Sequence, residues 1–151
     1  MRYLFEETQK FTQWWLWGVL LGPILISLII DSKNVSNSYL VISGVIILLI
    51  YCLQLRIKID QKGLHYQFFP FHLKSYTIKY DQIEKVEALT YNPIFDYGGW
   101  GIRYRMKGRA YNVKGNQGVK VYLKNGKNIL FGSQSYKEFE NTLTQNLKKV
   151  I

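Results

Sequence analysis

The basic side chains of the second half of the chain are the residues whose types and spacing could bind a ligand. Arg103, Arg105 and Lys107 alternate along an expected strand, so they share one face of it, and Arg109 follows at the next turn. Cationic groups in such a row can bind phosphate or carboxylate groups, and the alternative is a solvated outer face of a sheet. The same alternation recurs earlier in the chain, at Arg56 and Lys58.

A glycine-rich segment, Gly98-Gly99-Trp100-Gly101, resembles loops that hold a phosphate. Such loops need a helix directly after them, so that the helix N-terminus faces the anion. Here the sequence continues as an alternating strand over 102–106. We therefore expect these glycines to permit a bulge or a close backbone approach, not nucleotide binding.

Catalytic residue sets are missing from the sequence. The nearest approach to an acidic cluster is Asp81, Glu84 and Glu87, which reads as solvent-facing residues near a turn. No Ser/His/acid or Cys/His set stands out, and Cys52 is the single cysteine. We therefore expect a protein that is not an enzyme and that uses no metal and no cofactor.

Two long apolar runs, at 11–30 and 39–55, must position everything that follows. Each is about as long as a helix that crosses a bilayer, and neither contains a charged residue. A signal peptide and a buried hairpin are the alternatives. The sequence therefore predicts a transmembrane helical hairpin over 1–55. Because Lys and Arg flank the runs more than they occupy the loop, we expect both termini in the cytoplasm and the hairpin in the inner membrane.

Small residues lie within both apolar runs. Gly18 and Gly22 form a G-x-x-x-G spacing in the first run, and Gly44 lies near the middle of the second. Such residues let helix backbones approach closely. The two interpretations are packing within the hairpin and formation of a homo-oligomer. Runs without ionisable groups favour an anchor over a transporter.

The sequence pattern of residues 56–151 predicts one β-rich domain. This part of the chain holds the whole net charge of +10. Alternating strands are expected at 54–59, 64–69, 76–80, 83–90, 100–106, 110–113, 119–123 and 129–131, with Asn125-Gly126 as a hairpin turn. Ser135 and Glu138 predict the start of a C-terminal helix whose apolar stripe includes Phe139 and Leu143. We therefore expect an α+β fold: a bent antiparallel sheet or partly open barrel closed by one helix.

This order of elements resembles the pleckstrin-homology-like (PH-like) domain, as found in bacterial membrane proteins where it follows a two-helix hairpin. The resemblance lies in Tyr80-Asp81-Gln82-Ile83-Glu84-Lys85-Val86, in Tyr91-Asn92-Pro93-Ile94 and in Gly98-Gly99-Trp100-Gly101-Ile102-Arg103. It implies a cytoplasmic domain over 56–151. Two features depart from the family: Phe139 replaces the tryptophan of the C-terminal helix, and Arg56, Lys58 and Lys62 match its basic first hairpin poorly.

The excess of positive charge favours an anionic partner. No recognition helix is evident, so we do not expect nucleic acid. The leading hypothesis is a non-enzymatic, inner-membrane-anchored interaction module that binds a protein partner, anionic lipid headgroups or both. The alternative is a structural or accessory subunit of a membrane complex whose specificity lies in the hairpin.

Overall fold

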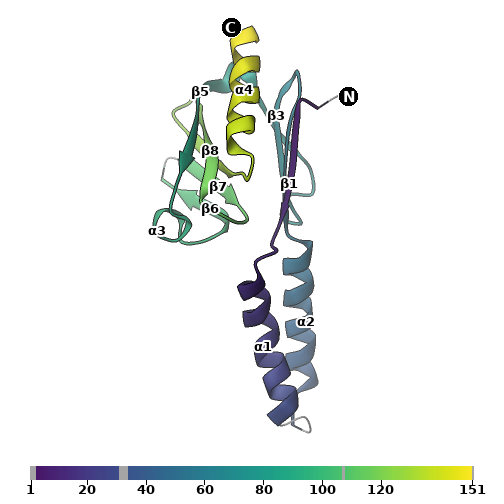
Figure 1. The fold of residues 1–151 in the computed structure, drawn as a ribbon. Helices are drawn as coiled ribbons and strands as arrows, with labels where there is room; N and C mark the ends of the chain where they lie inside the picture. The colour runs from purple at the N-terminus through teal and green to yellow at the C-terminus, as the bar shows by residue number, and fades with distance from the viewer. Residues whose placement is uncertain (1–2, 31–33, 107, 151) are drawn as a thin grey trace. The chain divides into compact units, whose positions relative to one another are not determined.

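The structure is a computed structural model that describes residues 3–30, 34–106 and 108–150. The chain divides into two compact units. One is Lys10–Leu53, which we call the hairpin unit. The other, the sheet unit, combines the N-terminal segment up to Gln9 with the chain from Gln54 onward. Both are drawn in Figure 1.

The hairpin unit contains two helices, α1 (Trp14–Ile30) and α2 (Asn37–Cys52). Ser36 caps α2 by accepting a hydrogen bond from the backbone of Ser38. The Trp17 indole donates to the Phe11 carbonyl and meets the Tyr51 ring edge-on. No residue of either helix is fully buried, and most of their apolar side chains are exposed.

The predicted transmembrane hairpin is wrong. Across the part of the chain that the structure describes, no helix has both the length and the apolar character that crossing a bilayer requires. The 17 residues of α1 and the 16 of α2 rise only about 25 Å, against a hydrocarbon core of roughly 30 Å. This finding overturns the expected spans at 11–30 and 39–55, the integral membrane partner and the inner-membrane location.

The glycines of the hairpin do not lie at its helix–helix contact. A Cβ atom added to Gly18, Gly22 or Gly44 would meet no atom within 4 Å outside its own helix and its chain neighbours. These positions therefore do not provide the close packing between α1 and α2 that the sequence suggests.

The sheet unit is α+β and contains two separate sheets. The first sheet has the order β1-β2-β3-β4. Its strands are β1 (Phe5–Lys10), β2 (Gln54–Ile59), β3 (Gly63–Phe69) and β4 (Tyr76–Lys79). A short 3₁₀ turn, η1 (Tyr80–Gln82), leads from β4 to the second sheet.

The second sheet has the order β5-β8-β9-β7-β6. Its strands are β5 (Ile83–Thr90), β6 (Gly101–Arg105), β7 (Gly108–Asn112), β8 (Gln117–Leu123) and β9 (Asn128–Gly132). Strands β7 and β9 pair in parallel, whereas the other strand pairs of this sheet are antiparallel. Two sheets, one of them mixed, replace the expected single bent antiparallel sheet or partly open barrel.

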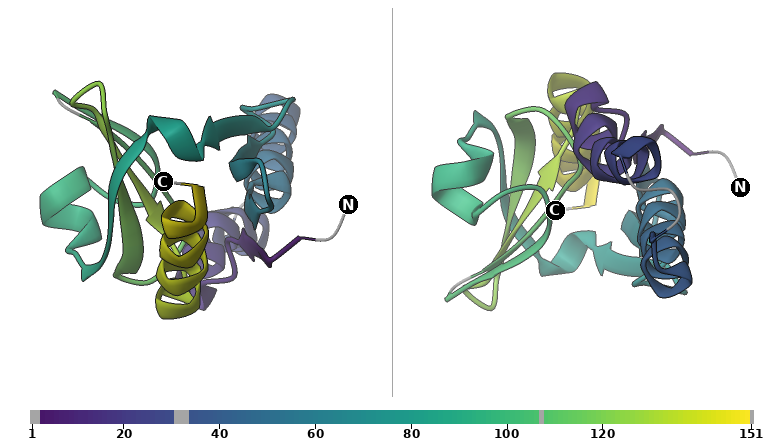
Figure 2. Two further views of the ribbon diagram at one scale, coloured as in Figure 1. Left: turned by 90° about the horizontal axis from the view of Figure 1, so that it is seen from above. Right: turned by 90° about the horizontal axis from the view of Figure 1, so that it is seen from below.

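The C-terminal helix α4 (Tyr136–Val150) joins the two sheets through its apolar face. Phe139 is fully buried, stacks on Phe5 of β1 at 5.3 Å between ring centroids and lies 6.2 Å from Phe131 of β9. Figure 2 shows α4 between the second sheet and strand β1. The helix therefore completes a core to which both sheets contribute.

Strand β1 and the short helix α3 (Pro93–Tyr97) were not expected from the sequence, and β1 matters more for the fold. It precedes the hairpin unit in the chain but belongs to the first sheet. Glu7 accepts hydrogen bonds from the Ser133 hydroxyl (2.5 Å) and the Gln134 N–H (2.9 Å), and Gln9 donates to the Gly132 carbonyl at 2.6 Å. The sheet unit thus includes residues from both sides of the hairpin.

Candidate anion-binding site

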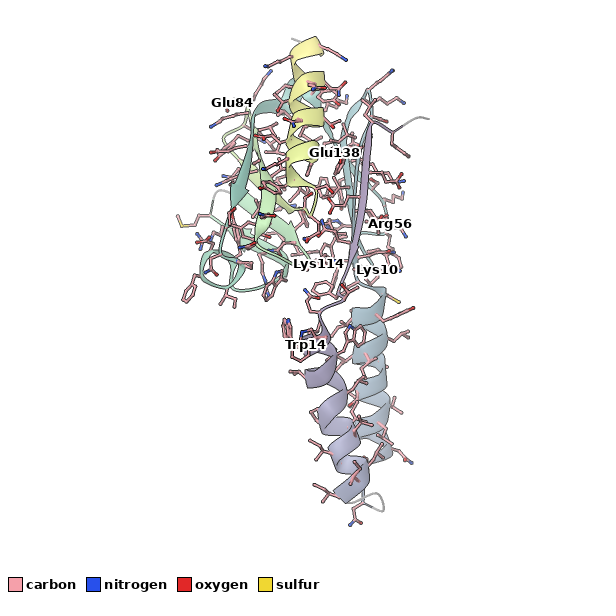
Figure 3. All side chains as sticks on the ribbon, in the orientation of Figure 1. Lys10, Trp14, Arg56, Glu84, Lys114 and Glu138 are labelled. Atoms are coloured by element: carbon pink, nitrogen blue, oxygen red, sulfur yellow. The ribbon has the colours of Figure 1, made fainter. Side chains whose placement is uncertain are left out.

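The outer face of β2 is basic because the strand alternates strictly. Leu55, Ile57 and Ile59 are completely buried on the inner face. Successive side chains of a strand point to opposite faces, so Arg56 and Lys58 must point outward. Figure 3 shows the Arg56 side chain leaving the first sheet on the side turned away from α4.

Strand register extends this face across β3 and β4. Lys58 lies opposite His65, and His65 lies opposite Thr77, so the three form one row. Over these strands lies a hollow of about 850 Å³, which we call the basic hollow. Its lining side chains are polar or charged, apart from the aromatic Tyr3: Arg56, Lys58, Asp60, Lys62, His65, Gln67, Ser75, Thr77 and Lys79.

Positive charge predominates in the basic hollow. Four cations line it against one carboxylate, that of Asp60. Lys58 pairs with Glu6 at 2.8 Å and lies 4.3 Å from the centre of the Tyr3 ring. Arg56, Lys62 and Lys79 form no ion pair with any described residue, so their charges remain available to a ligand.

The single carboxylate of the basic hollow is committed to internal contacts. Oδ1 of Asp60 accepts hydrogen bonds from the N–H groups of Lys62 (2.7 Å) and Gly63 (3.2 Å) and lies 2.9 Å from Nε2 of His65. Burial opposes ionisation, but these contacts outweigh it and lower the pKa of the Asp60 carboxyl. Asp60 therefore organises the β2–β3 turn as an anion and repels a ligand less than a free carboxylate would.

Two neighbours hold this arrangement in place. Nδ1 of His65 lies 2.7 Å from the Thr77 hydroxyl, so each ring nitrogen faces an oxygen atom, Nδ1 that of Thr77 and Nε2 that of Asp60. The Tyr80 hydroxyl donates to the Asp60 carbonyl at 2.7 Å. Burial, and then the Asp60 charge, raise the pKa of Tyr80 to about 12, so its hydroxyl stays protonated and continues to donate.

Asp60→Asn should lower the free energy of unfolding at neutral pH by about 1–3 kcal/mol, because charged hydrogen bonds are lost from a buried group. A carboxyl whose pKa is lowered in the fold stabilises it above the unfolded pKa of ~4. That contribution disappears as the pH falls through the lower folded value. Urea unfolding measured from pH 7 to pH 2 should therefore show that the difference in free energy of unfolding between the native protein and the variant becomes smaller as the pH falls. A difference that is constant with pH would contradict the assigned role of the Asp60 charge.

Arg103 and Arg105, the described members of the predicted cationic strip, share one face of β6, but Arg109 does not join them. Arg109 lies opposite Tyr104 in the β6–β7 register, on the other face. Its guanidinium is 5.2 Å from the Tyr104 ring centre. Lys107 lies outside the described residues. Of the site residues expected from the sequence, only Arg56 and Lys58 line the basic hollow.

Arg103 is held by the glycine-rich segment. One terminal nitrogen of its guanidinium donates to the Trp100 carbonyl at 3.0 Å, and a Cβ added to Gly99 would lie 3.2 Å from that nitrogen. The Trp100 indole donates to the Gly115 carbonyl. Gly98, Gly99 and Gly101 all have positive φ, which glycine adopts without strain. The segment therefore folds around an arginine of its own chain.

Lys62, His65, Thr77 and Lys79 were not among the residues predicted to bind a ligand. Alternation places Thr77 and Lys79 on one face of their strand, so the sequence already indicated that these two side chains lie on the same side. Their position beside Arg56 depends on strand pairing, which alternation does not reveal. Among the described residues, no group of three or more His, Cys, Asp or Glu side chains could hold a metal ion.

The chain was also compared with known proteins. No family model, no curated protein and no solved structure matches it.

Proposed function

We propose that this protein is a non-enzymatic interaction module that binds a phosphate-bearing anion in the basic hollow. The observation that carries the proposal is four lining cations against one carboxylate that is already hydrogen-bonded. Arginine and lysine bind phosphate oxygens through charge-assisted hydrogen bonds. His65, Ser75 and Thr77 add polar groups among the cations.

Phosphate groups of this kind occur on soluble polyphosphorylated molecules and on anionic lipid headgroups. The test therefore has two arms with the full-length protein: calorimetric titration with inositol hexakisphosphate, and co-sedimentation with phosphatidylcholine vesicles with and without phosphatidylglycerol. Binding in the first arm indicates a soluble ligand, and binding only to the charged vesicles indicates a headgroup. Absence of binding in both arms would overturn the proposal.

Replacing two cations of the hollow, Arg56→Gln with Lys79→Gln, should weaken the observed binding at least about tenfold, since each charged hydrogen bond contributes roughly 1.5–3 kcal/mol. The matched control is Lys124→Gln with Lys127→Gln, which removes the same charge from the exposed β8–β9 turn. The control should change affinity less than about twofold. Equal losses in both double variants would mean that only net charge matters, and the hollow would not be the site.

A structural role, with specificity in the hairpin unit, is the second candidate. The observation that favours it is the absence of any buried residue in α1 and α2. Apolar surface of this kind normally marks an interaction site. Replacing residues 10–53 with an unrelated hairpin separates the two functions. If the protein with the replaced hairpin still captures the same partner as the native protein, this second role is ruled out.

A further inference from the structure

The unpaired cations of the basic hollow lie at its two opposite ends. At one end, Arg56 of β2 lies opposite Gln67 of β3. At the other end, Lys79 of β4 lies opposite Gly63 of β3, and Lys62 precedes Gly63 in the turn between β2 and β3. None of these three cations forms an ion pair with a described residue. Each end of the hollow therefore offers positive charge to a ligand.

Strand register also gives the separation of the two ends. Gln67 and Gly63 both belong to β3, and the positions between them span about 13 Å along the strand at roughly 3.3 Å per residue. Arg56 and Lys79 stand on the strands on either side of β3, which adds about 10 Å across the sheet. Side chains of a strand stand roughly perpendicular to the sheet. One phosphate group therefore does not contact Arg56 and Lys79 at the same time.

The middle row of the basic hollow contains no unpaired lysine or arginine among its described residues. Lys58 pairs with Glu6 at 2.8 Å, and its ammonium lies 4.3 Å from the centre of the Tyr3 ring. His65 and Thr77 complete this row and are 2.7 Å apart. A neutral polar group can lie against these side chains, whereas a further anionic group finds no free cation there.

We propose that the anion bound in the basic hollow is a small soluble molecule with two phosphate groups, joined by a neutral polar spacer. One phosphate group contacts Arg56, and the other contacts Lys62 and Lys79. The lining suits a hydroxylated spacer, because Tyr3 is its single aromatic side chain and no aliphatic side chain lines the hollow to accept an acyl chain. This ligand class rests on the anion binding proposed above and adds the spacing of the anionic groups.

The test varies that spacing at constant charge. The full-length protein is titrated by calorimetry with the bisphosphates of ethylene glycol, triethylene glycol and tetraethylene glycol, and with methyl phosphate as the ligand for one end. We expect the better of the two longer bisphosphates to bind at least tenfold more tightly than the ethylene glycol compound. The second phosphate group then binds intramolecularly once the first is held.

Inositol hexakisphosphate, the probe of the proposed function, is titrated in parallel. If it binds while the longer bisphosphates bind no better than the ethylene glycol compound, the two-ended ligand is overturned and anion binding stands. If none of the phosphate compounds and no charged vesicle binds, both proposals are overturned.

Protein variants assign the two ends. Arg56→Gln, and separately Lys62→Gln with Lys79→Gln, should each remove most of the preference for the longer bisphosphate. The control, Lys124→Gln with Lys127→Gln, should retain that preference within about twofold. The measured quantity is the ratio of two affinities on the same variant, so a partial loss of folded protein does not change it. A preference that persists in both variants of the hollow would overturn the assignment.

Discussion

Phe139→Ala should lower the free energy of unfolding by about 3–5 kcal/mol, the cost usual for removing a buried phenylalanine ring. Phe139 has no exposed surface and contacts a ring from each sheet, Phe5 and Phe131. Its loss leaves a cavity where α4, β1 and β9 meet, and the three elements cannot all move to fill it. Urea unfolding of the full-length protein, followed by circular dichroism, measures the change.

The matched control is Phe95→Ala in α3 (Pro93–Tyr97), because the Phe95 side chain is 84% exposed. Exposed substitutions usually stay within about 0.5 kcal/mol. A loss at Phe139 no larger than that at Phe95 would show that α4 does not join the two sheets as described.

Gly63→Ala should cost about 2–5 kcal/mol, combining backbone strain with steric overlap. Gly63 opens β3 with φ at 151°, and an added Cβ would overlap the carbonyl oxygen of Ile78 on β4. Neither group can give way without separating a paired strand. Because the Gly63 N–H also binds Asp60, the variant should weaken anion binding in the basic hollow as well.

Gly126→Ala is the control for the strain component. Gly126 also has positive φ, at 78°, but a Cβ there would meet no atom within 4 Å. Its cost should be about 1 kcal/mol, from strain alone. If thermal and urea unfolding give equal losses for the two variants, the close approach of β3 to β4 is not the cause.

Local pattern was sufficient for most strands. The eight strands expected between 54 and 131 correspond to β2 through β9, because a strand with one buried face alternates in sequence. The helix expected after Ser135 is α4. Strand β1 was missed because its residues contact partners more than a hundred positions away, such as Gln9 at Gly132. A short window of sequence carries no sign of such contacts.

The apolar runs were misread because apolar character does not distinguish a helix from a buried strand. The second run was taken to extend through 55, but α2 ends at Cys52 and Leu53 is already extended. Leu55 is apolar as a buried residue of β2, not as part of a helix. The first run was taken to begin at 11, but α1 begins at Trp14, after the polar residues Thr12 and Gln13. Both helices are therefore shorter than the runs that predicted them.

The candidate site also combines features that the sequence determines with features that only the fold determines. Sequence alone determined which face of a strand is basic, because alternation is a property of one strand: Arg56 and Lys58 point away from the core. Only the tertiary structure decided which cations lie together. Register brought Lys79 and His65 to that face, and strand pairing put Arg109 and Arg103 on opposite faces of the second sheet. Binding depends on several charges close in space, and that proximity is set by long-range pairing, which a linear spacing of basic residues does not encode.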